Sequence, residues 1–255
     1  MKETYRNDVL AARLLERFIQ KSVASKLNLW DYTSMTNAKN LKWTEGNEKL
    51  VKTSGEAYRV LGFGIPADYN FDGGNTCPAA SACRGVCYAK QGRYIMAGVK
   101  NARLHNLNSF LSRGKLGFIG DAIADLTRFV KRYNVVRIHD SGDFFSQDYL
   151  DAWKAIASAF PAVIFYAYTK SHHLDIETNR PLNLRITQSL GGKYDEMINL
   201  ALSHARIFSS DADRLSANYI DGNESDIPAI EGEINIGLVY HGVRKLTDTQ
   251  RNYFR

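Results

Sequence analysis

The chain has 255 residues, of which 44% are hydrophobic and 24% charged, and its formal net charge is +6. This composition is ordinary for a globular protein, and we expect a single domain. No apolar run approaches the length of a membrane span and the first residues lack the apolar stretch of a signal peptide, so we expect a cytoplasmic protein rather than a membrane or secreted one.

The first third of the sequence predicts a helical extension that leads into a strand. Residues 1–30 have apolar side chains at helical spacing and charged side chains between them, which indicates an amphipathic helix. Residues 31–52 are polar and are expected to be extended or loop-like. Residues 58–66 then predict a strand that leads toward the cysteines.

Strands and helices alternate regularly through the rest of the chain. The predicted elements after the cysteines are a helical region to about residue 110, helices at 121–133, from 146 and at 194–204, and strands at 135–139, 163–168, 182–187, 206–210 and 234–240. This alternation predicts βαβ units in a mainly parallel sheet, either an open sheet or an incomplete TIM-like barrel. We therefore expect one α/β domain, in which residues 1–56 are an N-terminal extension and residues 57–245 a core that binds a metal cluster.

The three cysteines of the chain, Cys77, Cys83 and Cys87, lie within one eleven-residue stretch. Such clustering predicts a shared inorganic ligand, and the absence of a C-x-x-C pair favours an iron–sulfur cluster over structural zinc. A [4Fe–4S] cluster usually takes four thiolates, so three would leave one iron open to a small-molecule ligand. Cys83 and Cys87 would share one face of a helix. Zinc with His105 or His139 as fourth ligand, and buried free thiols without metal, remain alternatives.

Polar side chains follow several of the predicted strands, and parallel α/β proteins bind ligands at the carboxyl ends of their strands. The candidates there for proton transfer and anion contacts are His139, Asp140, Asp143, Lys170 and Asp211. His139 is also a candidate fourth cluster ligand. The aspartates could equally cap the following helices, and the His-Asp-x-x-Asp pattern also resembles a hard-metal ligand set.

The middle of the chain is strongly basic, with eleven Lys and Arg against two acids between residues 84 and 137. Lys90, Arg93, Lys100 and Arg103 have a spacing that tracks one helical face. A basic stripe of this kind can bind the phosphates of a nucleic acid. A solvated helix face without a partner explains it as well.

Three segments carry a family resemblance: Thr76–Lys90 with its cysteines, residues 137–144 and residues 166–170. Together they resemble the bacteriophage gene product 88 family, over about residues 62–241. The resemblance implies a phage origin and expression in the cytoplasm of a bacterial host.

A remoter similarity is to radical S-adenosylmethionine enzymes, which place a three-cysteine [4Fe–4S] loop ahead of an incomplete α/β barrel. That similarity would add S-adenosylmethionine as a cofactor at the open iron. The spacing here is C-x5-C-x3-C, whereas that superfamily uses C-x3-C-x2-C.

These observations predict a phage-encoded [4Fe–4S] protein whose three cysteines leave one iron open toward a polar cavity. Radical or other cluster-dependent catalysis would take place there on a small molecule. The alternative is a module stabilised by an iron–sulfur cluster or zinc that binds nucleic acid or a host protein without catalysis.

Overall fold

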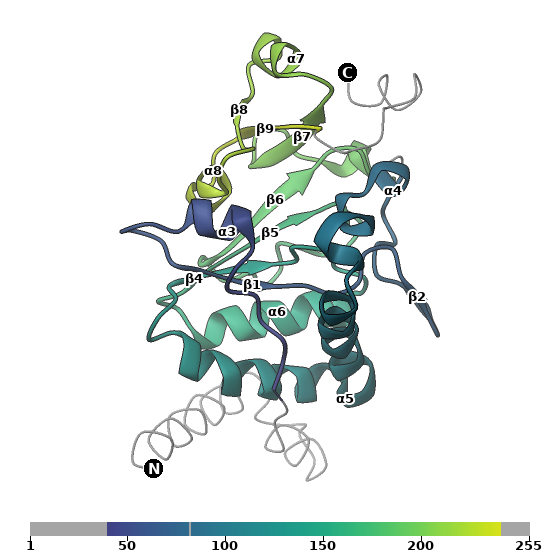
Figure 1. The fold of residues 1–255 in the computed structure, drawn as a ribbon, viewed down its shortest axis with the longest axis vertical. Coiled ribbons are helices and arrows are strands. Elements are labelled where there is room, and N and C mark those ends of the chain that lie inside the picture. The colour runs from purple at the N-terminus through teal and green to yellow at the C-terminus, as the bar shows by residue number, and fades with distance from the viewer. Residues whose placement is uncertain (1–39, 82, 241–255) are drawn as a thin grey trace.

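A seven-stranded parallel sheet forms the centre of the protein (Figure 1). The computed structural model describes residues 40–81 and 83–240. The strands are β1 (Val60–Phe63), β4 (Val135–Ile138), β5 (Ile164–Thr169), β6 (Leu184–Ser189), β7 (His204–Phe208), β8 (Ile220–Asp221) and β9 (Asn235–Val239). Their order is β1-β4-β5-β6-β7-β9-β8, and every pairing in this sheet is parallel. The predicted parallel sheet is confirmed, and it is open, with β1 and β8 at its edges.

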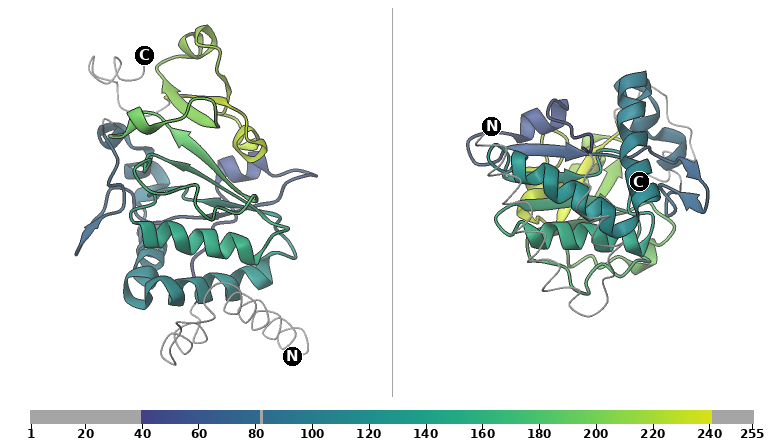
Figure 2. Two further views of the ribbon diagram at one scale, coloured as in Figure 1. Left: turned by 180° about the vertical axis from the view of Figure 1, so that it is seen from behind. Right: turned by 90° about the horizontal axis from the view of Figure 1, so that it is seen from below.

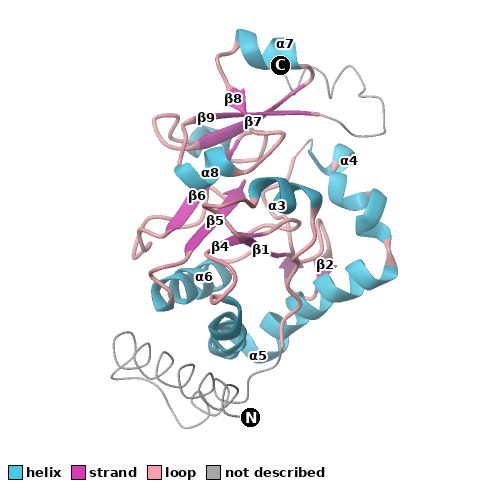
Figure 3. Cartoon of the chain, turned by 60° about the vertical axis from the view of Figure 1, so that its left-hand side comes forward, coloured by secondary structure: helices cyan, strands magenta, loops and turns pink. Residues whose placement is uncertain are grey.

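Helices cover both faces of this sheet (Figures 2 and 3). The helices are α3 (Glu48–Thr53), α4 (Cys83–Val86), α5 (Ala97–Phe129), α6 (Gln147–Ala159), α7 (Asp211–Ser216) and α8 (Ile227–Glu231). Short 3-10 helices are η1 (Tyr88–Lys90), η2 (Gly92–Ile95) and η3 (Asp195–Met197), and a small hairpin joins β2 (Asn70–Phe71) to β3 (Gly74–Asn75).

The larger hydrophobic core lies between the sheet and the helices α5 and α6. Trp153 and Tyr149 of α6, Phe118 of α5 and Phe63 of β1 are fully buried there, and the ring of Trp153 packs against those of Phe63 and Phe118. A smaller core on the opposite face includes Leu50 of α3 and residues of α8. Because both faces are covered, β1 and β4 are buried at every position.

The structure differs from the predicted elements in three places. The two predicted helical segments are present in residues 97–129, divided by a kink at Gly114, whose φ of 66° is not helical, but the second one begins before residue 121. Residues 48–53 of the predicted polar loop form α3. The helix predicted at 194–204 is wrong, because this segment holds only η3 before β7 begins. The predicted N-terminal helix lies outside the described residues. In the part of the chain that the structure describes, no helix has the length and apolarity to span a membrane.

Candidate functional site

The cysteine loop, defined as residues 77–81 and 83–91, is fastened to the segment that follows β6. Ala80 forms an isolated antiparallel bridge with Gly192. The backbone N–H of Lys193 donates to the carbonyl of Ala79 at 2.9 Å, and its Nζ donates to the carbonyl of Pro78 at 2.7 Å. The loop therefore lies over the carboxyl end of β6, as ligand-binding segments of parallel sheets do.

The three cysteines are half-buried free thiols. Cys83 begins α4, but this helix ends at Val86 and does not reach Cys87. The prediction that Cys83 and Cys87 share one helix face is therefore wrong. Burial, aided by nearby Asp143, raises the pKa of Cys77 to about 12, and burial also raises the pKa of Cys87. Among residues 40–81 and 83–240, no three Cys, His, Asp or Glu side chains form a group that could hold a metal ion. The donors thus share a loop without converging on one point.

Asp68 is the residue that ties this loop together, and the sequence did not single it out. Its backbone N–H donates to Sγ of Cys77 at 3.3 Å. Its carboxylate pairs with Nζ of Lys90 at 2.6 Å and with Nε of Arg84 at 3.4 Å. Asp68 has a left-handed backbone with φ of 47°. The only signal in the sequence for this conformation is that residues 66–75 are rich in turn-forming residues. Through its backbone N–H and its carboxylate, Asp68 therefore contacts Cys77, Arg84 and Lys90 of the loop.

Asp143 anchors the strand ends beneath the loop. Its carboxylate accepts hydrogen bonds from Oγ1 of Thr169 at 2.6 Å and from the backbone N–H groups of Lys170 and Phe144 at 2.9 and 2.7 Å. Burial nevertheless raises its pKa. Asp143 thus joins the end of β4 to the end of β5, close to Cys77.

Lys170 is the cation beside the thiols. Its Nζ donates to Oγ of Ser189 at 2.7 Å and to the carbonyl of Leu190. Desolvation lowers its pKa, while the thiol of Cys83, with Asp143, acts in the opposite direction. The predicted residues Lys170 and Asp143 therefore both lie next to the cysteine loop.

Asp140 holds the segment after the loop against the end of β4. Nη2 of Arg103 pairs with its Oδ2 at 2.5 Å, and the hydroxyl of Tyr88 donates to its carbonyl. Within residues 40–81 and 83–240 its buried Oδ1 has no hydrogen-bond partner, and it faces Gly64, where an added Cβ would lie 2.0 Å from that oxygen. Burial raises the pKa of Asp140. Although the ring of Tyr88 is 52% exposed, its hydroxyl is turned inward, so Tyr88 fixes the chain directly after Cys87.

The other predicted residues are placed differently. His139 has a φ of 68°, and its ring packs on Phe144 while Nε2 hydrogen-bonds the hydroxyl of Tyr149 at 3.1 Å. Asp211 is exposed at the start of α7, where it pairs with Arg214 at 2.7 Å. Figure 1 shows α7 and α4 in separate places. The contacts given above for His139 and Asp211 do not include the cysteine loop, so they add no support to the predicted roles of these two residues in proton transfer.

His139 gives the protein a measurable pH dependence of stability. Burial, assisted by Arg137, lowers its pKa to about 3. Since the unfolded state binds this proton near pH 6.5, the stabilisation is complete above pH 6.5 and is lost as the pH falls toward 3. Between pH 7.5 and 5.0 we expect the free energy of unfolding to fall by about 2 kcal/mol more in the wild type than in His139→Asn. Asparagine tolerates the left-handed backbone. Equal losses in urea titrations of both proteins would contradict this assignment.

The predicted basic stripe does not lie on the face of one helix. Lys90 lies in η1, Arg93 in η2, and Lys100 and Arg103 in α5, so three separate elements carry the four residues. Lys90 pairs with Asp68, and Arg103 pairs with buried Asp140. The predicted zinc ligand His105 hydrogen-bonds the carbonyl of Asn40 at 2.9 Å. Neither the stripe nor His105 adds a contact that favours a nucleic-acid or zinc site.

Comparison with known proteins places this architecture in a phage family. The family model described as "Gene product 88" matches residues 34–251. The "Gene 88 protein" of Mycobacterium phage D29 and that of Mycobacterium phage L5 are each 32% identical to the chain over 114 residues, which is 42% of this chain and 46% of the relative. The aligned part of the chain thus spans about half the length of the curated relatives it matches. No solved structure matches it. Because the family match extends over most of the sequence, the chain belongs to the gene product 88 family of bacteriophage proteins.

Proposed function

We propose that this protein is a phage-encoded iron–sulfur protein in which Cys77, Cys83 and Cys87 hold a [4Fe–4S] cluster and leave one iron without a cysteine ligand. The carrying observation is that the only three cysteines of the chain are free thiols on one loop, fastened at the carboxyl ends of parallel strands. Thiolates are the ligands that iron–sulfur clusters use. The reducing cytoplasm of an infected bacterium suits such ligands.

The surroundings of the loop support thiolate ligands in their chemistry. Lys170 provides a positive charge beside Cys83 and Cys77, and nearby positive charge favours the ionised form of a thiol. The raised pKa values of Cys77 and Cys87 mean that binding must displace their protons. Cluster incorporation is therefore expected to be more complete at pH 8.5 than at pH 6.5. The proposal rests on donor type and location, since the thiols do not converge in this structure.

We place the proposed binding site for a small molecule next to the polar residues at the strand ends. A cluster with an open iron supplies a position at which a small molecule can bind, and S-adenosylmethionine is one candidate. Asp143 and Lys170 are the residues placed beside the thiols to make polar contacts with such a ligand. Asp140 lies under Tyr88, one residue beyond Cys87. Catalytic roles for these residues, and for His139 and Asp211, stay predictions.

Anaerobic purification followed by absorption spectroscopy, with iron and sulfide analysis, tests the proposal. We expect a brown protein with about four iron and four sulfide per chain, and a loss of both in Cys77→Ser, Cys83→Ser and Cys87→Ser. Ser112→Ala, on the exposed side of α5, serves as a matched control that should keep the full complement. A colourless protein with one zinc and no iron would refute the cluster. Addition of S-adenosylmethionine to the reduced protein, with assay for 5′-deoxyadenosine, then tests radical chemistry separately.

A further inference from the structure

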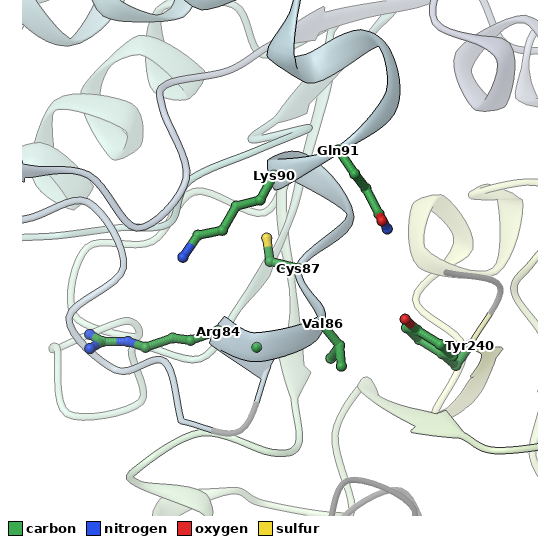
Figure 4. Close-up of a pocket in the computed structure, with 7 residues that line it drawn as sticks. Arg84, Val86, Cys87, Lys90, Gln91 and Tyr240 are labelled. Atoms are coloured by element: carbon green, nitrogen blue, oxygen red, sulfur yellow. The ribbon is translucent and has the colours of Figure 1, made fainter. Parts of the chain in front are cut away.

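A pocket of about 200 Å³ opens beside Cys87 (Figure 4). Its lining residues come from α4, η1 and the chain after β9: Arg84, Gly85, Val86, Cys87, Lys90, Gln91 and Tyr240. Drug-sized ligands usually occupy pockets of about 300–1,000 Å³. This pocket is smaller. Its size fits a small ion or metabolite.

The walls of the pocket are positively charged. Of the described residues that line it, Arg84 and Lys90 are cations and none is a carboxylate. Both cations extend to one side of the loop, while Gln91 and Tyr240 lie on the other and Cys87 lies between them (Figure 4). Asp68 pairs with both cations from outside the lining. One carboxylate offsets only one of two positive charges, so the group of three keeps a net charge of +1.

The lining also offers groups that hydrogen-bond an anion. A guanidinium has five N–H donors in a planar fork that matches carboxylates and phosphates, and an ammonium has three. Nε of Arg84 faces Asp68 and Nη2 donates to the carbonyl of Cys77 at 3.4 Å, which leaves further N–H groups on Arg84 and on Lys90. Gln91 adds an amide.

We infer that this pocket binds a small anion with a carboxylate or phosphate group, held by Arg84 and Lys90 beside the sulfur of Cys87. This inference names the chemical class of ligand that the loop accepts. The inference rests on the side chains that line the pocket. It does not require the proposed cluster, because the pocket and both cations belong to the protein without any cluster.

Alkylation of the metal-free protein by two reagents of different charge tests the inference. Iodoacetate and iodoacetamide both form an S–CH2 bond and release iodide, but only iodoacetate is an anion. The ratio of the two rates at one cysteine, measured by mass spectrometry, cancels differences in thiol ionisation and exposure. A unit charge about 6 Å away in water changes such a ratio about threefold. We expect the iodoacetate preference at Cys87 to fall by about threefold in Arg84→Gln and in Lys90→Gln.

Arg93→Gln is the matched control, because Arg93 is exposed on η2 and does not line the pocket. It should leave the ratio unchanged. Inorganic phosphate and acetate, each compared with chloride at equal ionic strength, should slow carboxymethylation of Cys87, and their relative strength distinguishes the phosphate class from the carboxylate class. A ratio at Cys87 that is unchanged in both variants, or equal protection by chloride, would overturn the inference. Because no iron is present in this assay, its outcome is independent of whether the cluster forms.

Discussion

Replacing Asp226 with asparagine is expected to lower the free energy of unfolding by about 3–5 kcal/mol, because it leaves the buried guanidinium of Arg137 without its counter-charge. Asp226 precedes α8 and is fully buried. Its Oδ2 accepts from Nη1 of Arg137 at 2.7 Å and from the hydroxyl of Tyr166 at 2.9 Å, and its Oδ1 pairs with Nζ of Lys49 at 2.9 Å. This one carboxylate joins β4, β5 and α3. Urea unfolding of Asp226→Asn should therefore show the whole decrease in the free energy of unfolding that follows from the loss of its negative charge.

The pH dependence of the same variant gives a second test. Burial raises the pKa of Asp226, but Arg137 and Lys49 outweigh burial and hold the pKa below its usual value. A depressed pKa means that the stabilisation is present above about pH 4, the value in the unfolded chain. The difference between wild type and Asp226→Asn should therefore be constant at neutral pH and shrink as the pH falls through the folded-state pKa.

Glu224→Gln is the control for this experiment. Its side chain is 78% exposed and lies 3.5 Å from Nζ of Lys52. An exposed pair of this kind contributes little, so the variant should stay within about 0.5 kcal/mol of wild type. If Asp226→Asn also costs less than about 1 kcal/mol, Arg137 does not depend on this carboxylate for its burial.

Elements that are determined by residues close together in the sequence could be predicted from the sequence. The run Val135–Ile138 is apolar enough for a buried parallel strand, apart from Arg137, and forms β4. Ser146 was a predicted helix start, and its Oγ accepts from the backbone N–H of Tyr149 as the N-cap of α6. Both features depend on residues at most a few positions apart.

The failures and omissions depend on distant partners. The apolar residues after Tyr194 suggest a helix, but Met197 and Leu200 are exposed and the segment serves as the short connection between β6 and β7. Nothing in the local sequence distinguishes Asp226 from exposed Asp221, because its partner Arg137 lies 89 positions away. Tertiary contacts of this range override local pattern.

The same reasoning explains why the cysteines were found from the sequence and Asp68 was not. Cys77, Cys83 and Cys87 are adjacent in the chain, and their clustering is visible without a structure. Asp68 shows its role only through its contacts with Lys90, 22 positions later, and with Cys77. Asp68 lies outside the cysteine loop in the sequence, so no motif or residue spacing identifies its contacts with the loop.

Asp68→Asn is expected to loosen residues 83–90 while leaving the global fold and the Ala80–Gly192 bridge intact. The variant keeps the backbone N–H that donates to Cys77, and asparagine also tolerates the left-handed backbone at this position. It removes the charge that holds Lys90 at 2.6 Å and Arg84 at 3.4 Å. Two charge-assisted contacts of a half-buried carboxylate are worth about 1–2 kcal/mol, so the loop should open about 5- to 30-fold more often.

Hydrogen exchange of amides 83–90 and alkylation of Cys83 and Cys87 by iodoacetamide measure this opening directly. Both rates should rise by that factor in Asp68→Asn and stay at the wild-type value in Asp72→Asn, whose side chain is exposed four residues further along. Because neither readout needs iron, an increase without any change in iron content would assign Asp68 to the loop alone. Faster exchange together with a proportional loss of iron would connect the two: the carboxylate that holds the loop closed would then also determine how well three half-buried thiols retain a cluster.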